Sequence, residues 1–394
     1  MNVYHNLKPG EIISQKIVNA IRTVAGEAKV ALHEPVFKGN EWSYLKDCLD
    51  SGYVSSIGQY VERFENQVCE FTGSKYAVAV VSGTAALHLG LLVGGIKPNE
   101  EVLIPSLTFI ATANAVSYCG AVPHFVDVSE VNLGIDSKKL RTYLREISIM
   151  EDGYCINKLT GRQIKAVVPM HVFGHPCDLK ALLEVADEFN IIVIEDAAEA
   201  IGSFYQNKHV GTFGKLGILS FNGNKTITTG GGGMILTDDI TIAKRAKHLS
   251  TTAKKAHPFK YFHDEIGFNY RMPNLNAALG CAQLEQLPNM LSKKRELFKI
   301  YFEVFSDIPD IEIFKEPFCC RSNYWLQTLL LNEKYMKNHE DIINSCIEAG
   351  INVRPAWTPL HQLPVFDTSP ASPMLTTSFL VKRIINIPSG VGLI

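Results

Sequence analysis

The sequence predicts an α/β protein built on a mainly parallel β-sheet. Seven short runs are rich in apolar and β-branched residues, and several are apolar throughout, as in strands covered on both faces. Helical patterns lie between some of these runs, and such alternation is typical of parallel sheets. The expected strands are residues 77–81, 101–105, 122–128, 166–172, 191–195, 216–221 and 233–237.

The expected helices, taken with the strands, indicate that the chain has three parts. Between the strands, residues 85–92, 112–118 and 178–189 have helical patterns, and 40–49 and 62–71 precede them. After Pro273 we expect two long helices, 276–287 and 292–305, and then a smaller α+β unit. The predicted organisation is a helical extension over residues 1–30, a large domain over 31–280 and a small C-terminal domain over 281–394.

Composition indicates a folded globular protein and argues against several classes. Of the 394 residues, 46% are hydrophobic and 20% charged, which is typical of a packed domain. The net charge of −2 argues against a general nucleic-acid binder. The nine cysteines are scattered without a CxxC pair, so we expect free core thiols in a reducing, cytoplasmic setting and no metal site.

No membrane segment is predicted. Residues 1–15 lack the basic and apolar regions of a secretory signal. Residues 76–96 carry no Asp, Glu, Lys or Arg, and their length would suit a membrane helix. However, the stretch is β-branched before residue 82 and rich in Ala and Leu after residue 84, so a buried strand, a turn and a helix fit it better.

The turn at residues 82–86 is a candidate anion site. Ser82-Gly83-Thr84 follows an expected strand and opens a helix, where backbone N–H groups and the helix dipole favour a negative charge. Gly83 permits the sharp turn and Thr84 adds a hydroxyl. An ordinary strand–helix turn is the alternative, and the GxxxxGK[ST] pattern of a P-loop is absent.

Asp196 ends a strongly apolar run, where an acid is unfavourable without a partner. Pyridoxal phosphate (PLP) would supply one, because a carboxylate beside its pyridine nitrogen keeps that nitrogen protonated. The small side chains of Ala197 and Ala198 would let a flat ring lie against them. A helix N-cap is the alternative, and both interpretations remain open at this point.

Lys225 is the candidate nucleophile. It lies just beyond the expected strand 216–221, in Ser220-Phe221-Asn222-Gly223-Asn224-Lys225, with glycines at 230–233. A lysine there can form a Schiff base and then act as a general base. Ser220 and Asn222 could reach a phosphate, and Phe109, beyond strand 101–105, could stack on a ring. A solvated lysine and a core phenylalanine are the alternatives.

The order of these motifs resembles the nucleotide-sugar aminotransferase family (DegT/StrS-like) of fold-type I, aspartate-aminotransferase-like PLP enzymes, over residues 31–389. The resemblance implies that Lys225 holds PLP as a Schiff base, that Asp196 pairs with the pyridinium and that Phe109 stacks on the ring. It implies a fold with a mainly parallel seven-stranded sheet and a smaller α+β domain. The implied cofactor-binding set is Gly83, Thr84, Ala85, Phe109, Asp196, Ala198, Glu199, Ser220, Asn222 and Asn269.

Asn269 carries an implication about assembly. It lies in Gly267-Phe268-Asn269-Tyr270-Arg271, which is similar to a segment that reaches the neighbouring subunit's active site in that family. The resemblance therefore implies a homodimer with shared active sites. An interdomain loop is the alternative for this segment.

Further matches concern the substrates. Residues 54–58 resemble a sugar-contact loop, and residues 354–361 a C-terminal substrate segment, so Ser56, Trp357 and His361 are candidate substrate contacts. For Trp357 and His361, plain packing is equally open. The implied reaction moves an amino group from glutamate to a nucleotide-linked keto-sugar by a ping-pong mechanism.

Glu199 departs from the wider family, where Gln or His usually lies near the cofactor's hydroxyl. A carboxylate there must be protonated or paired. Glu199, Phe221–Lys225 and Ala31–Pro35 are similar to a subgroup that aminates C4 of a UDP-linked 4-keto-6-deoxy-N-acetylhexosamine for bacterial surface sugars, as in legionaminic-acid pathways.

Several alternatives remain beside this reading. Other aminotransferase substrates are GDP-4-keto-6-deoxymannose and a 3-keto sugar. A PLP-dependent sugar dehydratase would have His at position 225, so the lysine argues against it. A non-catalytic PLP-fold regulator would need a nucleic-acid or membrane module, and none is recognisable in the sequence.

Overall fold

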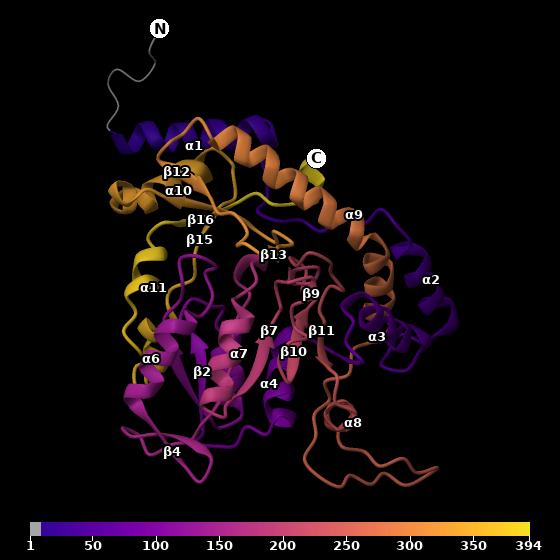
Figure 1. Cartoon of the computed structure of the whole chain (residues 1–394). Coiled ribbons are helices and arrows are strands. Elements are labelled where there is room, and N and C mark those ends of the chain that lie inside the picture. Colours follow the sequence, from indigo (N-terminus) through magenta and orange to yellow (C-terminus); the bar gives the residue numbers. More distant parts are fainter. Residues whose placement is uncertain (1–8) are drawn as a thin grey trace.

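The computed structural model describes residues 9–394, and its main sheet confirms the predicted fold class (Figure 1). The seven strands lie in the order β1-β11-β10-β7-β6-β2-β3. Neighbouring strands from β10 to β3 are parallel, whereas β11 is antiparallel to both β10 and β1. Their bounds are β1 (Tyr76–Val80), β2 (Glu101–Pro105), β3 (Val122–Val126), β6 (Ile164–Val167), β7 (Ile192–Asp196), β10 (Leu216–Ser220) and β11 (Gly233–Thr237).

Helices cover both faces of this sheet because its strands are apolar on both sides. In β2, Val102 and Ile104 belong to one core cluster and Leu103 to another, as the two-residue period of a strand requires. The first cluster packs against α4 (Gly83–Gly94), α5 (Ala111–Tyr118) and α8 (Ile240–Ser250). The second packs against α6 (Ser137–Ile147) and α7 (Leu179–Glu188).

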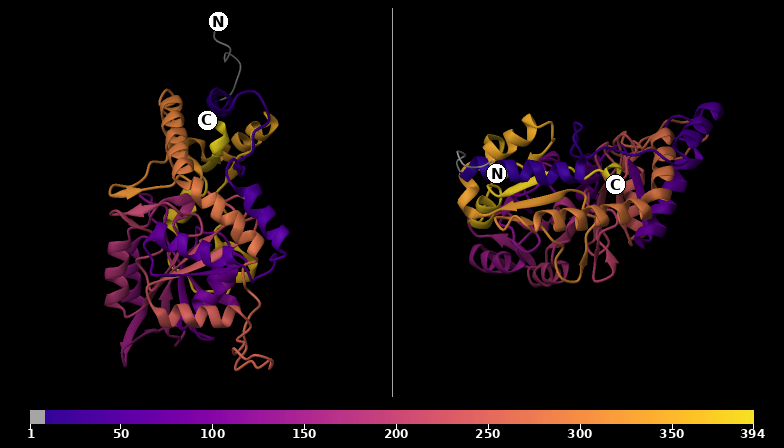
Figure 2. Two further views of the ribbon diagram at one scale, coloured as in Figure 1. Left: turned by 90° about the vertical axis from the view of Figure 1, so that its right-hand side faces the viewer. Right: turned by 90° about the horizontal axis from the view of Figure 1, so that it is seen from above.

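The N-terminal helices pack at different places. α1 (Pro9–Ala25) buries Ile13, Ile17 and Ile21 against the C-terminal sheet, while residues 1–8 of the predicted extension lie outside the described residues. α2 (Glu41–Ser51) and α3 (Gln59–Thr72) pack against the start of α9 (Asn274–Phe305). Figure 2 shows α1 beside the C-terminal elements, away from the main sheet.

The C-terminal part forms a second, antiparallel sheet. Its order is β12-β14-β16-β15, with a three-stranded sheet β13-β8-β9 and a hairpin β4-β5 elsewhere. The remaining elements are β4 (Ser148–Glu151), β5 (Tyr154–Asn157), β8 (Phe204–Tyr205), β9 (Lys208–His209), β12 (Ile311–Ile313), β13 (Cys320–Arg321), β14 (Gln327–Leu331), β15 (Arg354–Pro355), β16 (Ile384–Ile387), α10 (His339–Glu348) and α11 (Leu375–Leu380). Short 3-10 turns are η1 (Val172–Gly174), η2 (Glu333–Asn338), η3 (Leu360–Gln362), η4 (Pro364–Phe366) and η5 (Val391–Leu393).

Two local predictions were wrong. The expected helices 276–287 and 292–305 are one 32-residue helix, α9, which continues through Pro288 and through the predicted domain boundary at residue 280. Residues on both sides of the proline, Leu287 and Met290, are buried, and this packing lets the helix continue past it. The expected strand 166–172 stops at Val167 and is followed by the turn η1, in which Phe173 has φ 54°. The division into domains at residues 30 and 280 stays a prediction.

No helix within residues 9–394, the described part of the chain, is long and apolar enough to cross a membrane. The charge-free stretch 76–96 instead forms β1 and α4. All nine cysteines lie among the described residues and have free thiols.

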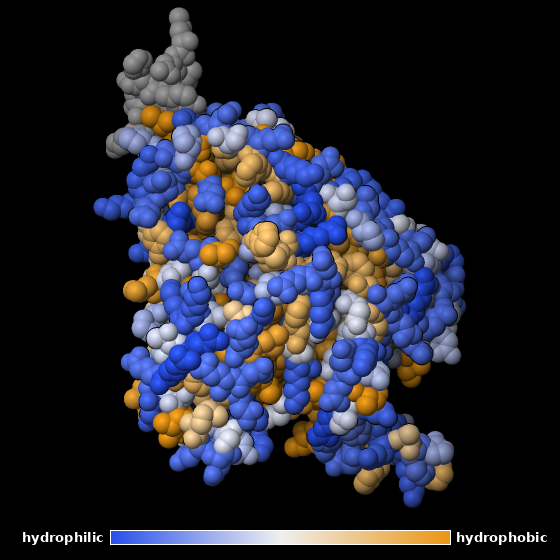
Figure 3. Space-filling model, in the orientation of Figure 1, coloured by the Kyte–Doolittle hydropathy of each residue, from blue (hydrophilic) through white to orange (hydrophobic). Residues whose placement is uncertain are grey.

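The face in Figure 3 is mostly hydrophilic, with hydrophobic residues scattered over it. The segment between α8 and α9 projects from the body (Figure 1) and exposes Phe259, Tyr261, Phe262 and Ile266.

Candidate active site

A cavity of about 360 Å³ lies at one edge of the main sheet. The carboxyl ends of β7 and β10 and the residues after β1, β2 and β6 meet there, as ligand sites in such sheets do. Because β11 is antiparallel, the residues just before it, Gly231 and Gly232, reach the same edge. Of the predicted residues, the lining includes Gly83, Thr84, Phe109, Asp196, Ala198, Glu199, Ser220, Asn222, Lys225 and Trp357.

The amine of Lys225 lies inside this cavity. Its side chain is only 13% exposed, and Nζ donates a hydrogen bond to Oε1 of Glu199 at 3.3 Å. On another side, Nζ lies 4.1 Å from the ring centroid of Trp325. The alternative of a solvated surface lysine is therefore wrong, and the amine stands where a carbonyl compound in the cavity could react with it.

Glu199 is a buried carboxyl held at both oxygens. Oε2 accepts a hydrogen bond from the backbone N–H of Phe173 at 2.9 Å, and Oε1 accepts from Lys225. The positive φ of Phe173 belongs to the turn that presents this N–H. Burial raises the pKa of Glu199 to about 7, although the charge of Lys225 opposes the rise. The group can therefore exchange a proton near neutral pH.

Asp196 lies at the floor of the cavity and is 3% exposed. Its Oδ2 accepts a hydrogen bond from Oγ1 of Thr112 at 2.7 Å, and Oδ1 accepts from the N–H of Ala198 at 3.2 Å. Burial raises the pKa of Asp196, and the bond from Thr112 counteracts part of that rise. A cationic ring nitrogen facing this carboxyl would favour its ionised form.

The N-terminus of α4 forms a polar part of the cavity wall. Ser82 caps the helix by accepting a hydrogen bond from the N–H of Ala85 at 3.1 Å. Gly83 packs so tightly on β10 that a Cβ at this position would meet Cβ of Ser220 at 2.8 Å. This close approach places the hydroxyl of Ser220 beside the positive end of the helix, where an anion is favoured.

Two predicted aromatic residues line the cavity in different ways. Phe109 is 51% exposed, so the alternative of a core phenylalanine is wrong. Trp357 stacks on Phe173 with ring centroids 5.0 Å apart and an interplanar angle of 30°. Trp357 therefore combines packing with a face on the cavity.

Four predicted residues lie outside the lining of this cavity: Ser56, Ala85, Asn269 and His361. The N–H of Ala85 is engaged by Ser82, and the side chain of Asn269 accepts a hydrogen bond from Arg271 at 3.2 Å. His361 lies 2.6 Å through Nδ1 from the hydroxyl of Ser106. The described chain alone therefore does not bring these four residues to Lys225.

Two residues of the cavity went unnoticed in the sequence. Thr112 supports Asp196 from the start of α5, and Trp325 covers Lys225 from the segment before β14. The run Ser322-Asn323-Tyr324-Trp325, polar and aromatic just before a buried strand, is the one local signal for the second. Nothing in the local sequence around Thr112 distinguishes it from other helical threonines.

Glu195, the neighbour of Asp196, supports the site from behind. It is fully buried and accepts hydrogen bonds from His171 at 3.1 Å and from the N–H groups of Gly211, Phe213 and Gly214 at 2.6–2.7 Å. Burial alone would raise the pKa of Glu195, but the bonds from His171 and the backbone lower it overall. These bonds tie the end of β7 to the following loops and thereby fix where Asp196 points.

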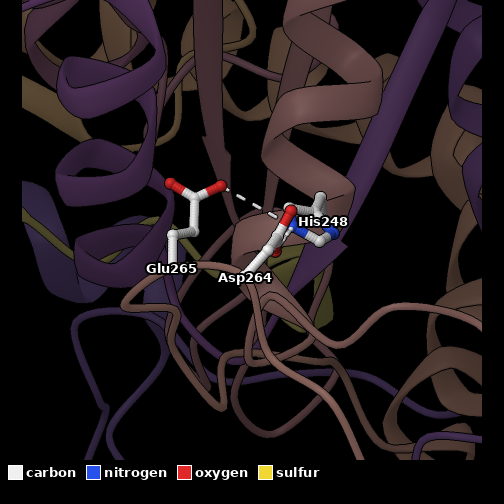
Figure 4. A group of neighbouring side chains, drawn as sticks. All are labelled: His248, Asp264 and Glu265. Atoms are coloured by element: carbon white, nitrogen blue, oxygen red, sulfur yellow. Dashed lines mark hydrogen bonds and ion pairs between the residues drawn. The ribbon is translucent and has the colours of Figure 1, made fainter.

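A second cluster of ionisable residues lies away from the cavity, where α8 meets the projecting segment (Figure 4). Nε2 of His248 lies 2.7 Å from Asp264 and 3.6 Å from Glu265. However, Arg245 already contacts both oxygens of Glu265, and Lys255 contacts Asp264 at 2.7 Å. The carboxylates thus have cationic partners, and the cluster anchors the projecting segment to α8.

The residues of the cavity fit PLP. The cavity is lined by an anion-favouring helix N-terminus, by the buried carboxyl of Asp196 and by the amine of Lys225, whose charge acts on that carboxyl. Gly83 and Gly232 let the backbone pack closely around this cavity, because a Cβ at either position would meet a neighbouring side chain within 3 Å. This donor set suits a flat, phosphorylated, cationic ring.

Comparisons with known proteins agree with this chemistry. Residues 36–394 match the model of the DegT/DnrJ/EryC1/StrS aminotransferase family. The chain is 39% identical to a GDP-perosamine synthase of Escherichia coli O157:H7, over 91% of this chain and 93% of the relative. It is 36% identical to EpsN of Bacillus subtilis, a putative pyridoxal phosphate-dependent aminotransferase, over 92% and 91%. The solved PseC of Helicobacter pylori, an aminotransferase of pseudoaminic acid biosynthesis, shares the fold with TM-score 0.82 and 24% identity over 92% and 94%.

Proposed function

Because the chain belongs to the DegT/DnrJ/EryC1/StrS aminotransferase family, we propose that it aminates C4 of GDP-4-keto-6-deoxymannose and so makes GDP-perosamine. It is a PLP-dependent nucleotide-sugar aminotransferase of surface polysaccharide biosynthesis. The observation that carries the proposed chemistry is the amine of Lys225 inside a cavity whose floor is the buried carboxyl of Asp196. An enzyme that transfers an amino group through PLP needs both an amine that reacts with a carbonyl group and a carboxylate that stabilises a cationic ring.

When bound, PLP supplies an electron sink for carbanion chemistry. In our proposal, Asp196 holds the ring nitrogen protonated, and Thr112 keeps Asp196 ionised through its hydrogen bond. Thr84 and Ser220 bind the phosphate at the start of α4, Asn222 supports that end, and Phe109 packs on the ring face. Ala198 leaves space for the other face.

Proton movement falls to Lys225 and Glu199 in this proposal. With its amine free, Lys225 would move a proton between the donor's carbon and the cofactor's carbon in the first half of the reaction, and between the cofactor's carbon and C4 of the sugar in the second. Glu199, with a pKa raised to about 7 by burial, can hold a proton for the cofactor's hydroxyl or for Lys225. A glutamine at this position could donate a hydrogen bond but could not exchange a proton.

The choice of sugar rests on the relatives and replaces our first expectation. The sequence favoured a UDP-linked N-acetylhexosamine, but the relatives at 38% and 39% identity are named GDP-perosamine synthases. These names favour the GDP-linked alternative. Trp357, Ser56 and His361 remain our proposed substrate contacts, and glutamate remains the proposed amino donor.

We further propose a homodimer in which each active site uses Asn269 of the other chain. Within one chain, Asn269 lies outside the lining of the cavity that holds Lys225. The projecting segment beside Asn269 exposes Phe259, Tyr261 and Ile266, and a cluster of such side chains is a candidate contact surface. The N-terminal loop at Ser56 is also flanked by an exposed apolar residue, Ile57.

Mixing two inactive variants tests the shared site. If Asn269 acts across the dimer, a Lys225→Ala chain paired with an Asn269→Ala chain rebuilds one intact site, and activity returns on mixing. If Asn269 acts within its own chain, both sites stay incomplete and the mixture is inactive. A sedimentation measurement that finds monomers would also overturn the dimer.

Absorbance spectra test the function itself. Purified protein with PLP should show a visible band that glutamate discharges and that Lys225→Ala lacks. Return of the band is then followed with GDP-4-keto-6-deoxymannose, a UDP-linked 4-keto-6-deoxy-N-acetylhexosamine and a 3-keto sugar. Faster return with the UDP sugar would overturn the GDP proposal while leaving the aminotransferase intact. A band that glutamate does not change would favour the dehydratase or another donor.

A further inference from the structure

We propose that Trp325 is a further catalytic residue, whose indole face holds the free amine of Lys225 in position inside the cavity. The inference rests on the proposed function in one respect, because it takes Lys225 as the reactive amine. It adds a residue that reaches the reaction centre from the segment leading into the C-terminal sheet, not from the main sheet.

The first argument is the contact itself. Nζ of Lys225 lies 4.1 Å from the centroid of the Trp325 ring, within the range of a cation–π interaction. Trp325 is 5% exposed and Lys225 13%, so water competes little with this contact. The carboxyl of Glu199 binds the same amine at 3.3 Å. The amine therefore has two partners, one ionic and one aromatic.

The second argument is that the ring is held in one orientation. Its Nε1 donates a hydrogen bond to the carbonyl of Asn224 at 2.7 Å, directly before Lys225. The backbone N–H of Trp325 donates to Oδ1 of Asn323 at 2.8 Å. The amide of Asn323 in turn donates to the carbonyl of Glu199 at 2.9 Å. These contacts form a closed ring that links Lys225, Trp325, Asn323 and Glu199.

The third argument is the support behind the ring. Lys294, a fully buried residue of α9, donates from Nζ to the carbonyls of Trp325 at 3.0 Å, Tyr324 at 3.4 Å and Ser389 at 2.9 Å. An uncharged amine still keeps two of these donors. Lys294 therefore acts as a positioning residue for Trp325, and it joins α9 to two other segments of the C-terminal part.

Trp357 provides a matched comparison in the same cavity. It is a second indole on the lining, but it stacks on Phe173, whereas the recorded aromatic partner of Lys225 is Trp325. A general loosening of the cavity would follow from either truncation. A specific hold on the amine depends on Trp325.

The experiment measures the reactivity of Lys225 in the PLP-free full-length chain. Acetic anhydride labels uncharged amines, so labelling of the Lys225 peptide is followed against pH by mass spectrometry. The amplitude reports access to the amine, and the midpoint reports how strongly the charged form is held. The other ionisable groups acting near this amine, Glu199, Asp196 and His33, are the same in every variant.

We expect Trp325→Leu to lower the midpoint by about one pH unit, because the aromatic partner of the ammonium is lost. Trp325→Phe keeps an aromatic face and should shift the labelling midpoint by less than half as much as Trp325→Leu does. Trp357→Leu should leave the midpoint unchanged. An unchanged midpoint in Trp325→Leu, or equal shifts in the two leucine variants, would overturn the proposal.

Lys294→Met separates positioning from plain stability. If Lys294 positions the ring, its loss shifts the labelling midpoint in the same direction as Trp325→Leu. A lower melting temperature with an unchanged midpoint would show that it only stabilises the fold. The labelling needs neither PLP nor sugar, so its outcome is independent of the spectra that test the proposed function.

Discussion

Nζ of Lys225 lies 3.3 Å from Oε1 of Glu199, and both side chains are largely buried in the same cavity. An ion pair in such a place is expensive to desolvate, and burial outweighs the attraction at the carboxyl, since the pKa of Glu199 is raised to about 7. Position 199 therefore carries a titrating carboxyl in this chain. Its protonation changes the charge beside the reactive amine.

Glu199→Gln should change how stability depends on pH. The pKa of Glu199 rises on folding from 4.5 to about 7, so the folded chain binds more protons in this window and loses stability as pH rises through it. We expect the stability of wild type relative to the variant to fall by on the order of 3 kcal/mol between pH 4.5 and 8. Melting temperatures of the PLP-free chains would show this.

Glu312→Gln is the control for that measurement, because Glu312 is exposed on β12. Its melting temperature, plotted against pH, should run parallel to that of wild type over the same pH range. If the plots for wild type and Glu199→Gln were also parallel, this would contradict a proton bound at Glu199.

Thr112→Val should weaken PLP binding. The change keeps the shape of the side chain but removes the 2.7 Å hydrogen bond to Asp196, whose pKa burial already raises. A hydrogen bond to a charged group contributes about 1.5–3 kcal/mol, so PLP affinity should fall at least roughly tenfold. The loss should grow as pH falls, because Asp196 then protonates at a higher pH than in wild type.

Thr112→Ser retains the hydroxyl and serves as the matched variant in this titration. Its affinity for PLP, measured by absorbance, should stay close to that of wild type. Equal affinities for all three proteins would show that Thr112 does not support Asp196.

Gly174→Ala should destabilise the fold strongly. Gly174 has φ +95°, and a Cβ there would lie 1.9 Å from Oδ1 of Asn323, whose amide is fixed by bonds to Glu199 and Ile201. We expect a loss of roughly 3 kcal/mol or more in thermal or urea unfolding.

Gly153→Ala separates the effect of the positive φ from the effect of the steric clash. Its φ is +80°, but nothing lies within 4 Å of an added Cβ. It should therefore be destabilised by only about 1–2 kcal/mol from the backbone conformation. Equal losses at the two glycines would argue against the packing of Asn323 on Gly174.

Lys294→Met should remove a pH-dependent contribution to stability. Burial lowers the pKa of Lys294 from 10.5 to about 7, so between these values the unfolded chain binds the extra proton and wild type gains stability as pH rises. Relative to the variant, this gain is on the order of 4 kcal/mol from pH 7 to 10. A difference in melting temperature that does not change with pH would contradict it.

Much of the fold could be predicted from the sequence because its signals are local. The strands at 101–105 and 233–237 have the predicted bounds, since a run buried on both faces stands out against its flanks. The helix through Pro288 could not be predicted in this way. A proline is a local signal for a break, whereas burial of Leu287 and Met290 against other elements decides that α9 continues.

The candidate site divides in the same manner. Asp196 and Lys225 were found from the sequence because each follows a buried strand, and the ends of parallel strands meet at one edge of a sheet. Trp325 lies 100 residues after Lys225 in the chain, in the segment that leads into the C-terminal sheet. No spacing rule therefore connects the two residues.

By itself, the sequence determined which strands form the sheet, which turn opens the helix α4, and which aspartate and lysine stand at the strand ends, because hydrophobic period and turn chemistry act over a few residues. Only the tertiary structure decided what surrounds the amine. The N–H of Phe173, the hydroxyl of Thr112 and the ring of Trp325 come from distant segments, and long-range packing brings them to Glu199, Asp196 and Lys225. Burial there also sets the pKa of Glu199, a property that no residue carries alone.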